Sequence, residues 1–255
     1  MKPPVLFIHG AFTRAGRWRP WAERFRAAGY HCVAPSLPAH DPPDRVALSR
    51  LTFADYVEAM VAEYESLGEP AIVVGSSMGG LIAQHVAART NARGLVLISS
   101  AAPWRGGSRA DTLPYVALYL VPVLLGRPLT GSKRAAKKLV LHDLSQAEQD
   151  ELLAIFADES GKAYRTMVLG GPPLAKGAVR CPVLCISGGG DRLFKPSVAE
   201  NIAAFYDAEH LIFPGAGHTL AAGDLAEPIT TGIMEWIEGL GLPPPSASLA
   251  AEAVV

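Results

Sequence analysis

The sequence predicts an α/β fold, a doubly wound and mainly parallel sheet of about six strands with helices on both faces. Two observations carry this prediction. Short apolar runs recur without the polar alternation of half-exposed strands, which is typical of strands buried on both faces of a parallel sheet. Helical patterns separate most of these runs, and alternating strands and helices favour right-handed crossovers.

The expected elements follow in chain order. Strands are expected at residues 5–8, 31–34, 71–74, 94–98, 183–186 and 210–213. Helices are expected at residues 17–28, 53–67, 79–89, 197–206 and 226–240. The first strand is expected as early as residue 5. We therefore expect no further strand before it, and the sheet should consist of about six strands.

The alternation stops between about residues 103 and 179, where three helical segments are expected. The first, at 114–125, is almost wholly apolar and either lines a pocket or packs the segment onto the core. The second carries a basic face over 133–138, which is typical of a solvated surface. The third opens with Ser145 and Glu148, a capping-box pattern. We expect a core of residues 1–102 and 180–240, a helical cap at 103–179 and a flexible tail at 241–255.

Composition narrows the class of protein. The chain has 255 residues, 49% of them hydrophobic, and a net charge of −1, which does not suggest binding to nucleic acid or to a charged membrane surface. No apolar stretch is long enough to span a bilayer, and the start lacks a secretory signal pattern. Cys32, Cys181 and Cys185 show neither a disulfide framework nor metal-ligand spacing. We expect a cytoplasmic protein without metal or cofactor and leave its oligomeric state open.

The stretch 75–79, Gly-Ser-Ser-Met-Gly, lies between an expected strand and an expected helix. On such a turn the Oγ of Ser77 projects above the sheet, and the Met78 N–H points into the same space at the positive end of the helix. The pattern alone can arise by chance in a glycine-rich chain, and a phosphate-binding turn is an alternative. Its position after a strand and before a helix favours a nucleophilic serine.

Two later residues complete a catalytic set. A serine nucleophile needs a base, and the base needs an orienting carboxylate. Asp191 and His218 each follow an expected strand in a glycine-rich loop, where open α/β sheets place their sites. Each alone could be an ordinary loop residue. The order Ser77, Asp191 and His218 in these loops together predicts a triad.

The loop after the first strand is expected to supply a second oxyanion donor. Gly10 lets the backbone bend, and the Ala11 N–H is expected beside the Met78 N–H, with Phe12 as a further substrate-binding residue. His9 is expected to organise this loop by hydrogen bonding rather than to act in catalysis.

These residues resemble the α/β-hydrolase superfamily, in particular serine esterases and lipases with a helical cap. The resemblance rests on the loop 9–12, the turn 75–80, the acid at 190–191 and the base at 217–218. It implies cleavage of a carboxylic ester, thioester or lactone of a small, largely apolar substrate, through an acyl-enzyme and without a cofactor. A C–C bond hydrolase, a cofactor-free perhydrolase and a ligand-binding receptor on the same scaffold stay open.

Departures from family patterns limit the subclass. Ser77 stands where haloalkane dehalogenases and epoxide hydrolases have aspartate, which argues against both. Gly10 and Thr219 argue against hydroxynitrile lyases, which tend to have Thr and Lys there. The loop 36–41 departs from the common D-x-P-G-H-G pattern, and we expect it to edge the pocket.

Overall fold

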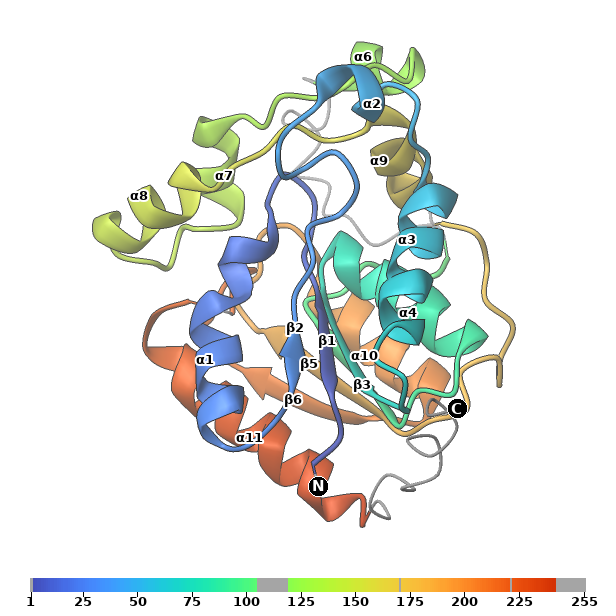
Figure 1. Ribbon diagram of the computed structural model, residues 1–255. Helices are drawn as coiled ribbons and strands as arrows, with labels where there is room; N and C mark the ends of the chain where they lie inside the picture. Colours follow the sequence, from blue (N-terminus) through green and yellow to red (C-terminus); the bar gives the residue numbers. More distant parts are fainter. Residues whose placement is uncertain (1, 105–118, 170, 221, 242–255) are drawn as a thin grey trace.

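A computed structural model describes residues 2–104, 119–169, 171–220 and 222–241 (Figure 1). Six strands form one sheet in the order β2-β1-β3-β4-β5-β6, and every neighbouring pair is parallel. The strands are β1 (Val5–Ile8), β2 (Cys32–Val33), β3 (Ile72–Ser76), β4 (Gly94–Ile98), β5 (Val183–Gly188) and β6 (Glu209–Phe213). The predicted parallel sheet of about six strands is confirmed.

Helices cover both faces of the sheet and bury it. One face packs against α1 (Arg19–Ala27) and α11 (Ala226–Gly239), and the other against α3 (Phe53–Glu65), α4 (Met78–Arg89) and α10 (Pro196–Tyr206). Alternate residues of β1 enter separate hydrophobic clusters: Val5 and Phe7 lie in one, Leu6 and Ile8 in the other. This two-sided burial is why the strand sequences are apolar without alternation.

The bounds of some helices and strands differ from the sequence prediction at the turns that connect them. The expected strand 71–74 continues to Ser76, and α4 begins at Met78, so the connecting turn is Ser77 alone. The first helix begins at Arg19 rather than at residue 17, because residues 15–18 form a 3-10 turn, η1 (Ala15–Trp18). A second 3-10 turn, η3 (Gly223–Leu225), precedes α11.

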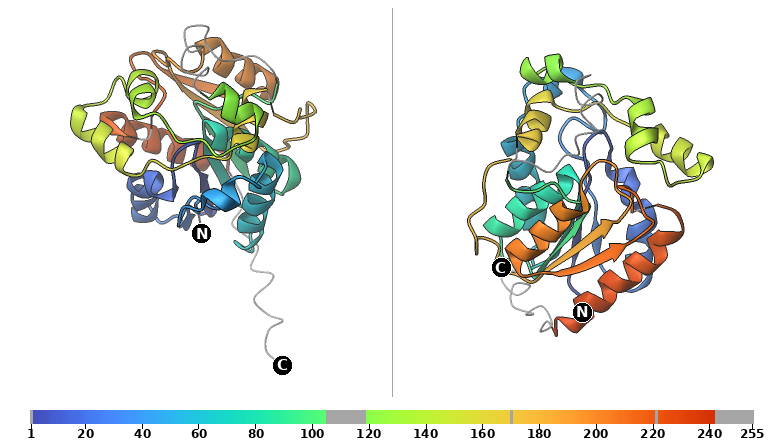
Figure 2. Two further views of the ribbon diagram at one scale, coloured as in Figure 1. Left: turned by 90° about the horizontal axis from the view of Figure 1, so that it is seen from above. Right: turned by 180° about the vertical axis from the view of Figure 1, so that it is seen from behind.

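Four helices lie between β4 and β5 in the part of the chain that the structure describes: α6 (Leu120–Leu124), α7 (Lys133–Leu139), α8 (Gln146–Ala154) and α9 (Gly161–Val168). They extend over the carboxyl ends of the strands, with α7 and α8 at one side and α6 and α9 at the other (Figures 1 and 2). The predicted capping box of α8 is present: the Glu148 N–H donates to Ser145 Oγ at 3.4 Å, and the Ser145 N–H donates to Glu148 Oε2 at 2.7 Å.

Two short helices were not predicted. The α9 helix is capped by Ser160, whose Oγ accepts the Ala163 N–H at 3.2 Å. Its first residue is Gly161, a poor helix former, and a Cβ there would lie 2.1 Å from the Arg127 carbonyl oxygen. Tertiary packing thus overrides propensity at this position. The other is α2 (Arg45–Leu48), a single turn capped by Asp44.

The expected apolar helix at 114–125 is described only in part, since 114–118 lie outside the described residues. Within α6, Val121 and Leu124 are exposed to solvent. In the described ranges no helix is both long and apolar enough to cross a bilayer.

Candidate active site

Ser77 occupies the one-residue turn between β3 and α4, with φ 55° and ψ −122°. A positive φ is strained for a residue with a side chain, so the surrounding structure must hold it. The end of β4 supplies this support. The Ser77 N–H donates to the Ile98 carbonyl at 3.0 Å, and the Ser77 carbonyl accepts the Ala101 N–H at 3.0 Å.

The glycines of the turn allow close packing rather than unusual dihedral angles. A Cβ at Gly75 would lie 2.3 Å from the Gly79 carbonyl oxygen, and a Cβ at Gly79 would lie 2.3 Å from the His9 carbonyl oxygen. The start of α4 therefore touches the end of β1. This contact brings the loop that follows β1 against Ser77.

His218 and Asp191 form a buried pair beside this turn. The His218 Nδ1 lies 2.8 Å from Asp191 Oδ2. The other carboxylate oxygen, Oδ1, accepts the Leu193 and Phe194 N–H groups at 2.7 and 3.0 Å. These contacts fix the carboxylate, which holds the proton on Nδ1 and leaves Nε2 of His218 free to act as a base.

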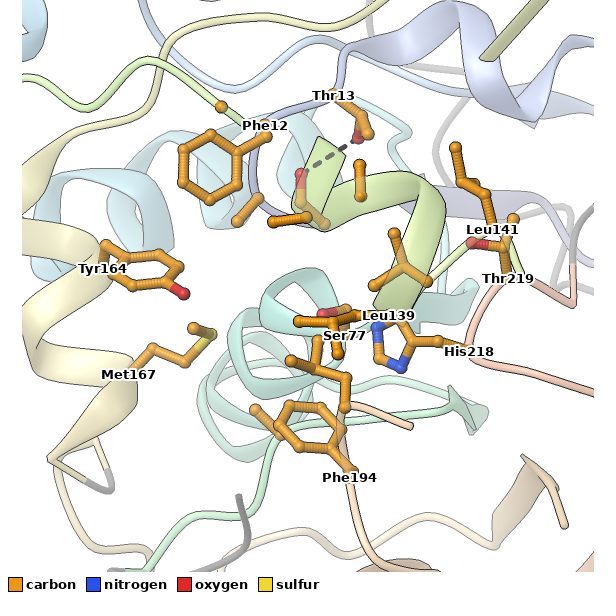
Figure 3. A pocket seen from close by; sticks show the side chains of 18 of the residues that line it. Phe12, Thr13, Ser77, Leu139, Leu141, Tyr164, Met167, Phe194, His218 and Thr219 are labelled. Carbon is orange, nitrogen blue, oxygen red and sulfur yellow. Dashed lines mark hydrogen bonds between the residues drawn. The ribbon is translucent and has the colours of Figure 1, made fainter. Parts of the chain in front are cut away.

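Ser77 and His218 line the same pocket and lie next to each other (Figure 3). Among the described residues, Ser77 Oγ makes no direct hydrogen bond to His218. Catalytic hydrogen bonds are often long in sites without substrate and tighten when substrate binds. The three residues predicted from sequence are thus brought together by the ends of β3, β5 and β6.

The loop after β1 packs directly on the serine. A Cβ at Gly10 would lie 3.1 Å from the Ser77 Cβ and 3.7 Å from its Oγ. In the described part of the chain, neither the Ala11 N–H nor the Met78 N–H has a hydrogen-bond acceptor. Two unpaired donors beside a serine, one of them at a helix N-terminus, can stabilise a developing oxyanion.

Phe12 contributes its side chain and not its N–H. Its backbone has φ 61°, and its N–H donates to Glu159 Oε2 at 3.3 Å. The ring lines the pocket, where it lies 5.3 Å from the Tyr164 ring and 5.6 Å from the Tyr119 ring between centroids. Its placement fits a substrate-binding residue and does not fit an oxyanion donor.

His9 is fully buried and organises the loop, as its sequence context suggested. Its Nε2 accepts the Leu37 N–H at 2.9 Å, and its Nδ1 lies 2.9 Å from the Gly10 carbonyl, to which it donates. Burial, with a smaller repulsion from His40, lowers the pKa of His9 to about 3. The ring is therefore neutral and unsuited to proton transfer near neutral pH.

Glu159 is a residue that sequence reasoning missed. Its carboxylate is fully buried and accepts four donors: the Tyr56 hydroxyl and the Ser160 N–H at 2.7 Å, and His40 Nε2 and the Phe12 N–H at 3.3 Å. Burial alone would lower the pKa of His40, but hydrogen bonding and charge attraction from Glu159 raise it. Glu159 thus ties the segment before α9 to the loop that carries Ala11.

The pocket over Ser77 has an empty volume of about 1370 Å³, including its mouth. Its lining is mostly apolar, and α7, α9 and the loop after β1 each contribute several residues to it. Large side chains that line it include Phe12, Tyr119, Phe156, Tyr164, Met167 and Phe194. Tyr164 and Met167 lie on the other side of the cavity from His218 (Figure 3).

One expectation about the pocket lining is corrected, and a second is met in part. The loop 36–41 does not edge the pocket, because Leu37 and His40 point inward to His9 and Glu159. The apolar segment 114–125 was expected to line a pocket or to pack onto the core: Tyr119 lines the pocket, and residues 121–125 do not.

Within the described ranges, no group of three or more His, Cys, Asp or Glu side chains could hold a metal ion. The acidic and imidazole groups near Ser77 instead pair with each other or with backbone N–H groups. The arrangement places a serine hydroxyl, a carboxylate-paired imidazole and two unpaired backbone N–H groups at one apolar pocket.

Comparison with known proteins places this geometry in context. A sequence model described as the alpha/beta hydrolase family matches residues 5–227. The magnesium-chelatase 30 kDa subunit of Rhodobacter capsulatus is 25% identical over 93% of this chain and 87% of its own. The monoacylglycerol lipase of Paleococcus ferrophilus is 19% identical with a TM-score of 0.74, covering 94% of this chain and 97% of the lipase. A polyneuridine aldehyde esterase variant is 14% identical with a TM-score of 0.73, covering 92% and 99%. At such identities the two structures share the fold.

Proposed function

Since this chain belongs to the alpha/beta hydrolase family, we propose that it is a serine hydrolase of the carboxylesterase type. Its substrate is a carboxylic ester, thioester or lactone of a small, largely apolar acyl compound. The observation that carries the proposal is the meeting of Ser77 with the buried His218–Asp191 pair at one wall of an apolar pocket. That the fold resembles those of a lipase and an esterase supports the same class of reaction.

In the proposed mechanism, Ser77 Oγ attacks the substrate carbonyl carbon while His218 Nε2 takes its proton. Asp191, at 2.8 Å from Nδ1, stabilises the imidazolium. The tetrahedral intermediate collapses when His218 gives that proton to the leaving oxygen, which departs as the alcohol. His218 then deprotonates a water that attacks the acyl-serine. The acid leaves and Ser77 Oγ recovers its proton.

The Ala11 and Met78 N–H groups bind the oxyanion in both tetrahedral intermediates. Their lack of any acceptor among the described residues supports this role. Removing one such donor typically costs about 2.7–4 kcal/mol of activation free energy.

The inserted helices act as a cap over the nucleophile, and the chain divides into a core of 1–102 and 180–240, a cap of 103–179 and a tail of 241–255. The support for a cap is that α7, α8 and α9 contribute residues to the pocket wall. Because Cys32, Cys181 and Cys185 are all free thiols, a reducing cytoplasmic location suits the protein.

The test is the turnover of p-nitrophenyl esters of increasing acyl length by the wild-type protein and by Ser77→Ala. We expect kcat to fall by about 10⁴-fold or more in the variant, with an unchanged circular dichroism spectrum. A matched control, Ser76→Ala, removes the neighbouring buried hydroxyl and should keep most of the activity. Equal turnover by wild type and Ser77→Ala would refute the assignment.

A second function is a ligand-binding subunit that retains the site without turnover. This function is suggested by the 25% identity, along 93% of the chain, to a protein that is named as a subunit of magnesium chelatase. Reaction with a fluorophosphonate separates the two proposals. Labelling of Ser77 together with repeated turnover of any ester supports the hydrolase, whereas labelling without turnover supports the binding protein.

A further inference from the structure

Arg17 brings a positive charge into a pocket that is otherwise apolar. It lies in η1, four residues after Thr13 in the loop that follows β1. It lines the same cavity as Ser77 and His218. Of the pocket-lining residues that the structure describes, Arg17 is the only one with a permanent charge, and none is an aspartate or glutamate. A single cation in the same cavity as the proposed nucleophile calls for an explanation.

The guanidinium of Arg17 has no hydrogen-bond or ion-pair partner within the described ranges. Its Nε is shielded from solvent and makes no hydrogen bond, and no carboxylate lies within ion-pairing distance of it. Its side chain contacts the buried Trp18 ring, whose centroid lies 5.4 Å from Cζ. Two other arginines show the contrast: Arg14 donates to the Phe156 carbonyl at 3.3 Å, and Arg89 pairs with Glu58.

Arg17 is partly buried, and its shielded Nε has no acceptor, so an anion entering the pocket would supply the partner that the protein does not. Burial lowers the pKa of Arg17 to about 10, which still leaves the group charged at neutral pH. A guanidinium presents its donors as a planar fork that matches the two oxygens of a carboxylate. One cation balances one monoanionic carboxylate, whereas a phosphate monoester carries nearly two charges at pH 7.

We propose that Arg17 binds a carboxylate of the substrate, so that the preferred esters carry one free carboxylate away from the scissile bond, as half-esters of dicarboxylic acids do. This inference rests on the proposed hydrolase function. The apolar walls around Phe12, Tyr164 and Met167 then hold the hydrocarbon chain, and Arg17 fixes one end of the molecule. The pair thereby sets the register of the carbonyl against Ser77.

The experiment compares charged and neutral esters of equal length. One series is p-nitrophenyl half-esters of dicarboxylic acids from succinate to suberate, set against p-nitrophenyl alkanoates. A second series places the carboxylate on the alcohol side, as 4-carboxyphenyl hexanoate against phenyl hexanoate. We expect the wild-type protein to favour the charged ester by about 10- to 100-fold in kcat/KM at the best length in one series.

Variants then assign the preference to Arg17. The ratio of charged to neutral kcat/KM is the readout, because it cancels any loss of folded protein. Arg17→Met keeps an unbranched side chain and should bring the ratio toward one, while Arg17→Lys keeps part of the preference. Arg19→Met, which removes an exposed charge two residues later, should leave the ratio unchanged.

The outcomes separate this inference from the proposed function. If neutral esters are hydrolysed in a Ser77-dependent way without preference for a carboxylate in either series, the Arg17 proposal is wrong and the hydrolase stands. The Arg17 proposal is equally wrong if a preference survives Arg17→Met. If no ester is turned over, binding of adipate monoethyl ester to Ser77→Ala, measured by calorimetry, replaces kinetics. Equal affinity in Ser77→Ala with and without Arg17→Met then overturns the proposal.

Discussion

Glu159→Gln should destabilise the protein. It should also impair catalysis, because Glu159 holds the loop after β1 that carries the proposed oxyanion donor Ala11. The carboxylate is fully buried and accepts four donors, two on each oxygen. A glutamine amide offers only one acceptor oxygen. If that oxygen keeps the Tyr56 hydroxyl and the Ser160 N–H, the amide nitrogen faces the Phe12 N–H, which then lacks an acceptor.

The magnitude follows from these bonds. An unsatisfied buried N–H costs about 1–3 kcal/mol, and bonds to a neutral acceptor are weaker by about 1 kcal/mol than bonds to a carboxylate. Relief of the buried charge offsets part of the sum. We expect the free energy of unfolding to fall by about 2–4 kcal/mol, a large share of the roughly 5–15 kcal/mol of a typical domain. Because Phe12 follows Ala11, kcat should also fall by about tenfold or more.

Urea unfolding followed by tryptophan fluorescence, with linear extrapolation to water, measures the loss. The matched control is Glu58→Gln, which removes an exposed carboxylate paired with Arg89 and should leave stability close to that of the wild type. An unfolding free energy of Glu159→Gln within about 0.5 kcal/mol of the wild type, with full turnover, would refute this account of the cluster.

Four further substitutions have defined outcomes. Asp191→Asn should lower kcat by about 10⁴-fold. The melting temperature should change little, because the asparagine side-chain oxygen can still accept the two backbone N–H groups that Oδ1 accepts. A loss of tenfold or less in kcat would contradict the orienting role. Gly79→Ala should destabilise by about 1–3 kcal/mol or prevent folding, because its Cβ would lie 2.3 Å from the His9 carbonyl oxygen. Gly232→Ala, in α11 with open space around it, should instead stabilise by about 0.5–1 kcal/mol in thermal unfolding. The His9 pKa of about 3 lies below its usual 6.5, so its contribution to stability is present above pH 6.5 and is lost as pH falls. Between pH 7.5 and pH 5 the loss is about 2 kcal/mol, and His9→Asn should remove this part of the acid dependence; an unchanged slope of unfolding free energy against pH argues against a buried neutral His9.

The candidate catalytic set is predictable from the sequence, because each of its residues has a local signature. Ser77 lies between an apolar run and a helix, and Asp191 and His218 follow strands in glycine-rich loops. Parallel strands bring their carboxyl ends to one edge of the sheet, so loops that are distant in sequence meet there. The geometry agrees with this expectation, including the Gly10 loop that packs on Ser77.

Other parts of the site have no local signature. Tyr56, His40 and Glu159 are separated by up to 119 residues, and each alone is an ordinary polar residue until the chain folds. Arg17 lies in an arginine-rich stretch typical of a solvated surface, and its unpaired guanidinium is visible only in the packed structure. The loop 36–41 was expected at the pocket edge. Instead, its His40 contacts the buried carboxylate of Glu159 and does not line the pocket.

The measurement that tests the nucleophile assignment most directly is mass spectrometry of the protein after reaction with a fluorophosphonate, followed by peptide mapping. We predict one adduct per chain, located on Ser77, and no adduct after Ser77→Ala. An adduct on another residue, or none on a folded protein that hydrolyses esters, would contradict the assignment of Ser77 as the nucleophile.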